Sequence, residues 1–191
     1  MQDLFKAHLN KFIMITDTEF EAISSFFTII SVKKKQNLLT EGAICRSHYF
    51  VLQGCLRKFF INEKGVEQTT EFAIENWWVT DHISYEHRRP SEFFIQAVEP
   101  AHLLMITKDK QDELLQAHPT MERYFRFIYQ RAYAAAQMRT KYIFGLSKEA
   151  FYHHLNNHYP EFVQRIPQYL IASYLGFTPE YLSEIRAKKN S

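Results

Sequence analysis

The 191-residue chain is poor in cysteine and contains no long apolar run. Its two cysteines, Cys45 and Cys55, are too few for a disulfide framework or for the four-cysteine ligand set of a structural zinc or iron–sulfur site. No apolar stretch reaches the ~18 residues of a membrane span, and the first residues lack the basic-then-apolar order of a signal peptide. We therefore expect a cytoplasmic protein with no membrane partner, no bound metal and no cofactor.

Glycine and net charge are also scarce. The five glycines all stand at apparent turns, so the chain has no glycine-rich loop for binding phosphate. Its 23 basic and 21 acidic residues give a net charge of +2, so any surface for nucleic acid has to come from local clustering. Residues 121–148 cluster basic side chains around a single acidic residue, Glu122, although a solvated helix face is the commoner explanation of one such run. What is plentiful is apolar residues, at 46%, which is ample for a packed core.

The first half of the chain carries strand signals. Short apolar or alternating runs, separated by turn residues, occupy residues 27–32, 47–52, 55–61, 66–74, 92–98 and 102–106. Their regular spacing predicts a small antiparallel β-barrel or jelly roll. A helix over residues 17–26, capped by Thr16 or Asp17, is predicted to precede the barrel and to pack against it.

After residue 108 the strand signals stop, which makes the chain α+β. The pattern predicts a short helix over 108–117 and a long helix from Thr120 to a break at Gly145, with Ser147 capping the next helix. The long helix carries a four-three seam interrupted only by Arg139: Met121, Phe125, Ile128, Ala132, Ala135 and Tyr142. The alternative is a helix packed on its own barrel. A length of roughly six to seven turns exceeds what a small barrel covers and favours a homodimer seam.

Residues 167–186 have the outline of a helix, a tight turn and a second helix. Gly176 supplies the positive φ that such a turn needs, Thr178 is a good N-cap, and Pro179 suits the first helical position. Leu182 and Ile185 are three apart and anchor the second helix, which leaves its other face polar. This outline predicts a helix-turn-helix that binds double-stranded DNA, and an ordinary pair of packed helices is the alternative.

A β-barrel, a long helix, a hinge and a C-terminal helix-turn-helix, in that order, resemble the Crp/Fnr family of bacterial transcription regulators. The resemblance covers nearly the whole chain and is most specific over residues 159–168 and 171–186, which are similar to a compact branch of that family. It implies an effector-sensing barrel over 1–118, a dimerisation helix and hinge over 119–145, and a DNA-binding domain over 146–191.

For the helix-turn-helix, the resemblance implies that Gln168 contacts backbone phosphate. The residues implied to face the DNA groove are Thr178, Pro179, Glu180, Ser183 and Glu184. Glu180 matches a family position that reads a cytosine amino group, which suits a carboxylate acceptor. Because well-studied members have arginines at the positions of Pro179 and Glu184, we expect a different target sequence. The residues expected to supply further phosphate contacts are Arg186, Lys188 and Lys189.

For the barrel, the resemblance is to cyclic-nucleotide-binding members, but their ligand cassette is degenerate here. The Gly-Glu pair for the ribose is absent, and Pro90 stands where the phosphate-binding arginine belongs. We therefore expect a small-molecule effector other than cAMP, or none. The candidate pocket residues are Trp77, Trp78, Thr80, Asp81, Arg88, Arg89 and Ser91. The adjacent tryptophans, if on a strand, point to opposite faces, and the preferred interpretation has one fill the core and the other cover the long helix.

The leading hypothesis is a dimeric, sequence-specific transcription regulator, not an enzyme, whose effector shifts the recognition helices through the hinge near Gly145. RNA polymerase is a further expected partner if the protein activates transcription. A ligand-binding or protein-interaction module with a degenerate helix-turn-helix remains open, because Glu180 and Glu184 lie on the reading face. A cupin-like enzyme needs a metal, yet His154 and His158 lack a third ligand. The barrel histidines form no His-x-His pair: His48, His82, His87 and His102.

Overall fold

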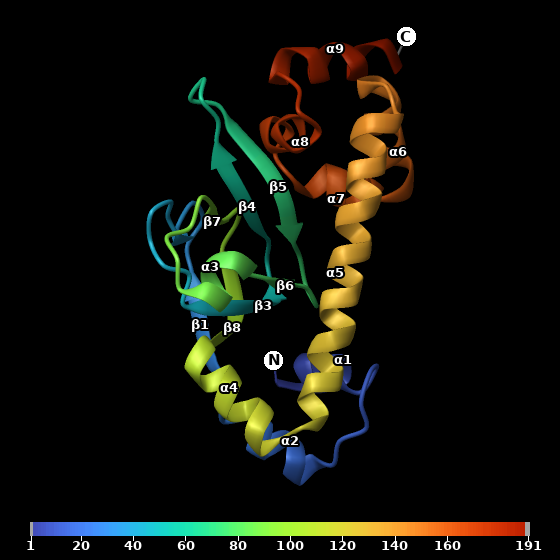
Figure 1. Ribbon diagram of the computed structural model, residues 1–191. Helices are drawn as coiled ribbons and strands as arrows, with labels where there is room; N and C mark the ends of the chain where they lie inside the picture. The colour runs from blue at the N-terminus through green and yellow to red at the C-terminus, as the bar shows by residue number, and fades with distance from the viewer. Residues whose placement is uncertain (1, 190–191) are drawn as a thin grey trace. The chain divides into compact units, whose positions relative to one another are not determined.

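The computed structural model describes residues 2–189 and divides into two compact units (Figure 1). The first unit runs up to Phe60 and continues over Glu71–Arg131. The second unit combines the short segment Ile61–Thr70 with the chain from Ala132 onward. The sequence pattern predicts that the barrel domain ends at residue 118. In the structure, the division between the two units falls within the long helix, after Arg131, and the end of a β-hairpin, Ile61–Thr70, belongs to the second unit.

Two four-stranded antiparallel sheets make up the β-structure. One sheet has the strand order β1 (Thr28–Val32), β8 (Ala101–Thr107), β3 (Ser47–Gln53), β6 (Trp78–Val79). The other has the order β2 (Asn37–Leu39), β7 (Phe94–Ala97), β4 (Leu56–Ile61), β5 (Glu67–Ala73). The predicted α+β class is confirmed. The short strands β2 and β6 were not predicted, because runs of three and two residues show no periodicity.

Buried side chains contributed by every strand fill the space between the two sheets. Tyr49 and Val51 of β3, Leu103 of β8, Leu56 of β4 and Ile95 of β7 belong to this cluster. These positions follow the period-2 alternation of strands, so the intervening residues of β3 and β8 point to the opposite face. The barrel interior is therefore a packed apolar core.

The opposite face of the first sheet is covered by helices. Phe50, Leu52 and Leu104 join a second apolar cluster with side chains of α1 (Gln2–Leu9), α2 (Asp17–Ser24), α4 (Lys108–Ala117) and the beginning of α5 (Thr120–Gly145). Because both faces of β3 are covered, all of its residues except Gln53 are buried. The predicted helix after Thr16 is confirmed, with a capping box between Thr16 and Glu19, whereas α1 was not predicted.

A buried tyrosine joins three of these elements. The Tyr124 hydroxyl of α5 accepts a hydrogen bond from the Trp78 indole at 2.8 Å and lies 2.9 Å from Nδ1 of His8 in α1. Burial lowers the pKa of His8 to about 4, so its ring is neutral near pH 7 and Nδ1 can accept the Tyr124 proton.

The interpretation of the two tryptophans is corrected by the structure. Trp78 alone covers the long helix, packing 5.4 Å from the ring of Phe125, and it belongs to the helix-facing cluster. Trp77 does not fill the barrel and is 43% exposed. The reason is that β6 begins only at Trp78, so Trp77 lies in the preceding turn, where strand alternation does not apply.

Candidate functional site

Two helices near the end of the chain form the predicted helix-turn-helix. The first is α8 (Gln168–Leu175), and the chain leaves it through Gly176, which has φ 74° and ψ 35°. The Phe177 N–H donates to the carbonyl of Ala172 at 2.8 Å, which closes a Schellman-type helix end. The turn residue that the sequence indicated is therefore confirmed, since this left-handed backbone conformation favours glycine.

The second helix is α9 (Pro179–Lys189), and its cap is the predicted one. The Thr178 hydroxyl accepts from the N–H of Tyr181 at 3.3 Å. Leu182 and Ile185 are each only 1% exposed, so they anchor α9 in its own unit. This anchoring turns the polar residues of α9 to solvent.

The structure brings the predicted DNA-reading residues together on one exposed surface. The exposed side chains at the start and on the outer face of α9 are Thr178, Pro179, Glu180, Ser183, Glu184 and Arg186. Gln168 is exposed at the first turn of α8. The side chains of Lys188 and Lys189 lie outside the described part of the chain.

The β4–β5 hairpin segment contacts the first helix of the motif, within the second unit. The Ser173 hydroxyl of α8 donates to the carbonyl of Glu67 at 2.8 Å and accepts from the N–H of Thr69 at 3.0 Å. The Arg139 guanidinium of α5 donates to the carbonyls of Thr69 and Tyr174 and lies 4.0 Å from the centre of the Tyr174 ring. Ser173 and its partners Glu67 and Thr69 are about a hundred residues apart. Local sequence patterns do not indicate contacts over such separations, so this contact was not predicted.

Arg139 also explains the interruption of the predicted seam. It is a charged residue in an apolar repeat because it binds its own chain's backbone. The structure places the other seam residues in different surroundings. Met121, Phe125 and Ile128 are buried in the core of the first unit, and Tyr142 packs on the ring of His154 in α6 (Lys148–His158). Of the six predicted seam residues, Ala132 and Ala135 remain exposed.

Trp78 belongs to the helix-facing cluster, and the other six predicted pocket residues fall into two groups. Thr80, Asp81 and Ser91 are buried and hydrogen-bonded to neighbours in the chain. Asp81 caps α3 (His82–His87), accepting from the N–H groups of Ile83 and Ser84, and it accepts the Ser91 hydroxyl proton at 2.6 Å. Thr80 donates to the carbonyl of Ser47 at 3.0 Å. The polar groups at this end of the cassette are thus already satisfied by the chain itself.

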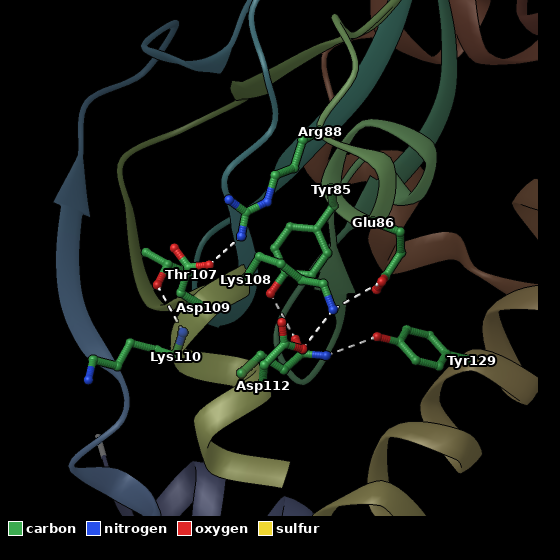
Figure 2. A network of polar contacts seen from close by, with 10 residues as sticks. Tyr85, Glu86, Arg88, Thr107, Lys108, Asp109, Lys110, Asp112 and Tyr129 are labelled. Atoms are coloured by element: carbon green, nitrogen blue, oxygen red, sulfur yellow. Dashed lines mark hydrogen bonds and ion pairs between the residues drawn. The ribbon is translucent and has the colours of Figure 1, made fainter. Parts of the chain in front are cut away.

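The other group faces outward. Arg88 ends α3 in the left-handed conformation and pairs with Asp109 of α4 (Figure 2). Arg89 is exposed, as is Trp77. The arginines that could replace the missing phosphate ligand are therefore not gathered with Ser91 at a buried site.

A polar network ties α3 to α4 and α5 (Figure 2). The Tyr85 hydroxyl donates to Oε1 of Gln111 at 2.9 Å, and the Gln111 amide donates to the Tyr129 hydroxyl at 3.3 Å. Burial raises the pKa of Tyr85, which keeps this hydroxyl protonated as the donor. Lys108 completes the network by pairing with Glu86 of α3 and Asp112 of α4. No spacing in the sequence indicates this network.

No metal-binding cluster of three or more histidine, cysteine, aspartate or glutamate side chains occurs within residues 2–189. The rings of His154 and His158 are tilted relative to one another with their centres 4.2 Å apart, and Nδ1 of His158 lies 2.8 Å from the carbonyl oxygen of His154. Over the same residues, no helix combines the length and apolar character needed to cross a membrane.

Known proteins share this fold. Residues 29–118 match the family model of the cyclic nucleotide-binding domain. The structure of the c-di-GMP responsive global regulator CLP of Xanthomonas campestris superposes with a TM-score of 0.74 at 13% identity, covering 92% of each chain. A putative Crp/Fnr-family regulator of Eubacterium rectale superposes with a TM-score of 0.67 at 16% identity, covering 90% of this chain and 82% of its own.

A curated relative points the same way. The anaerobic regulatory protein of Haemophilus influenzae is 26% identical over 165 residues, which cover 81% of this chain. The match covers only 63% of that relative's length. The chain therefore resembles regulators of the Crp/Fnr family in fold, and its residues 29–118 match the cyclic nucleotide-binding domain.

Proposed function

We propose that this chain is a dimeric transcription regulator that recognises a specific DNA sequence with α9. The observation that carries the proposal is the exposed polar face of α9, held outward by the burial of Leu182 and Ile185. A recognition helix needs this arrangement, because one face must pack on the first helix while the other enters the major groove.

The chemistry of this face supports base reading by acceptors. Glu180 and Glu184 offer carboxylates that suit cytosine amino groups, and Thr178 and Ser183 offer hydroxyls. We assign phosphate contacts to Gln168 at the start of α8 and to Arg186, both of which are exposed. A dimer of such units reads a near-palindromic site with half-sites about one DNA turn apart.

The middle of α5 supports association with a second copy. Every residue from 130 to 138 is exposed, and this stretch contains Ala132, Tyr133, Ala134, Ala135 and Ala136. A helix segment of small and aromatic residues without cover from its own chain gains stability when another helix packs against it. The alanines allow close approach of the two helices. We therefore place the dimer contact on residues 130–138.

Introducing two arginines into this stretch tests the dimer. Ala132→Arg with Ala135→Arg should raise the dimer dissociation constant by about 100-fold or more, because two charges per chain would be desolvated at the contact. Arginine is nearly as good a helix former as alanine, so the helix itself should persist. Sedimentation equilibrium measures the constant.

The matched control places two arginines at exposed positions in the last turn of α4, as Gln116→Arg with Ala117→Arg. It should leave the constant unchanged. Equal dimerisation of both double variants would contradict a contact through residues 130–138.

The barrel supports a sensor role with an effector other than a cyclic nucleotide. Asp81 already accepts the hydroxyl proton of Ser91, and Arg88 is engaged with Asp109 at the surface. A phosphate at this place would have to displace the Asp81 carboxylate, which carries the same sign of charge.

Selection from random double-stranded DNA, followed by gel shift at fixed salt, tests the proposed function directly. A regulator should enrich one near-palindromic sequence over random DNA. Failure to enrich any sequence would favour the second candidate, a protein-interaction module, which the two carboxylates on the exposed face of α9 keep open.

A further inference from the structure

A cavity of about 320 Å³ lies in the first unit, between the amino-terminal helices and the first sheet. It is open to solvent beside the exposed residues Thr28 and Ile29, and its lining comes from α1, α2, β1, β8 and the turn before β1. The apolar side chains that line it are Phe5, Phe20, Phe27, Ile29 and Leu104. Nothing in the degenerate cassette contributes to this lining, so the cavity is separate from the pocket that the sequence indicated.

The side chains that line the cavity indicate which class of ligand it can bind. No charged side chain lines the cavity, and its polar side chains are the hydroxyls of Ser24 and Thr28. The Ser24 hydroxyl already donates to the carbonyl of Glu21 at 2.9 Å. An ion placed there would lose part of its hydration without gaining a partner of opposite charge. An uncharged molecule with one or two aromatic rings suits the three phenylalanines.

The volume agrees with such a ligand. Binding sites for small molecules begin at about 300 Å³, and an apolar cavity of ~150 Å³ is known to hold benzene. A cavity of about 320 Å³ therefore has room for a two-ring molecule but not for a nucleotide with its hydration.

The cavity is also connected to the long helix. The ring of Phe5 lies 5.0 Å from Phe27 inside the lining, 5.1 Å from Phe50 and 6.3 Å from Tyr124 of α5. Tyr124 in turn holds Trp78 and His8 by hydrogen bonds. A ligand that moves Phe5 therefore acts on α5 through directly packed rings.

We propose that this cavity binds a small uncharged aromatic molecule and is the effector site of the regulator. The effector role rests on the proposed DNA-binding function, whereas the binding itself does not. The site differs from a cyclic-nucleotide site in both place and chemistry.

The test uses the whole protein, 2-naphthol as an uncharged two-ring probe, and 2-naphthoate as its charged counterpart. Calorimetry should show saturable binding of 2-naphthol and binding of 2-naphthoate at least about 10-fold weaker. Ser24→Leu, which fills the cavity, should weaken 2-naphthol binding by about 10-fold or more. Ile29→Trp fills it from the exposed side and should act in the same direction.

Ser25→Leu is the matched control. Ser25 follows Ser24 at the end of α2 and makes the equivalent hydrogen bond, to the carbonyl of Ala22, but it does not line the cavity. This variant should bind 2-naphthol as the unmodified protein does. Circular dichroism identifies any variant that has failed to fold. If Ser24→Leu does not fold, the 2-naphthol affinity of Ile29→Trp tests the site in its place.

The outcomes separate the two proposals. Absence of 2-naphthol binding, or binding that neither filling variant weakens, would overturn the site whatever the protein does with DNA. Binding that the filling variants abolish, with no change in the DNA affinity measured by gel shift, would overturn its effector role. A saturating probe that shifts the DNA affinity several-fold in the unmodified protein, but not in Ser24→Leu, would support both.

Discussion

Reversing three basic charges at the end of α9 should weaken specific DNA binding by about 100- to 1,000-fold. The change is Arg186→Glu with Lys188→Glu and Lys189→Glu. With a net charge of only +2, the chain has no general electrostatic attraction to DNA, so a few local cations must supply it. Under the proposed function, each reversal removes a phosphate contact and adds repulsion. Gel shift over a range of salt concentrations should also show a less steep salt dependence, because fewer counterions are released.

The matched control reverses three exposed lysines of the first unit, Lys11, Lys33 and Lys34. It changes the net charge by the same amount and should change the DNA affinity less than about 5-fold at physiological salt. Equal losses in both variants would mean that binding reflects net charge alone. An unaffected α9 variant would contradict the proposed interface and favour the interaction module.

Replacing Gly54 with alanine should destabilise the protein by about 3–5 kcal/mol. Gly54 joins β3 to β4 with φ +101°, a conformation that residues with a Cβ rarely adopt. A Cβ there would stand 2.6 Å from Cβ of Ala101 and 2.7 Å from the carbonyl oxygen of Pro100, and neither atom is the far end of a flexible side chain that could move aside. The strain of the backbone and the steric clash therefore add. Urea or thermal unfolding measures the change.

Gly65 provides the control within the same chain. Its φ is +74°, but a Cβ would meet nothing within 4 Å. Gly65→Ala should therefore cost about 1–2 kcal/mol, the backbone strain alone. Similar losses for the two variants would show that close approach to β8 is not what requires glycine at position 54.

Elements defined by near neighbours were predicted well from the sequence. The helix over 108–117, the long helix from Thr120 to Gly145, the Ser147 cap and the turn at Gly176 all follow from caps and glycines acting over a few residues. The short elements β2, β6 and α3 were missed, because they are too brief to show a period. Strands with longer alternating or apolar runs were found.

The long helix shows where periodicity reaches its limit. Its apolar positions continue from Met121 to Tyr142, and the sequence pattern treats them as one seam. In the structure, the first positions pack on the chain's own core and the middle ones are exposed. A heptad pattern records that a face is apolar, but it does not record which surface covers it.

The sequence by itself determined the order of the parts, the helix-turn-helix and the residues on the polar face of α9. These depend on spacings of three and four residues and on local caps, which chain connectivity alone controls. Only the tertiary structure decided the partners of Ser173 and Arg139, the burial of Ser91 by Asp81, and the cavity beside Phe5. These features bring together side chains far apart in the sequence, and the packing of whole elements fixes their contacts.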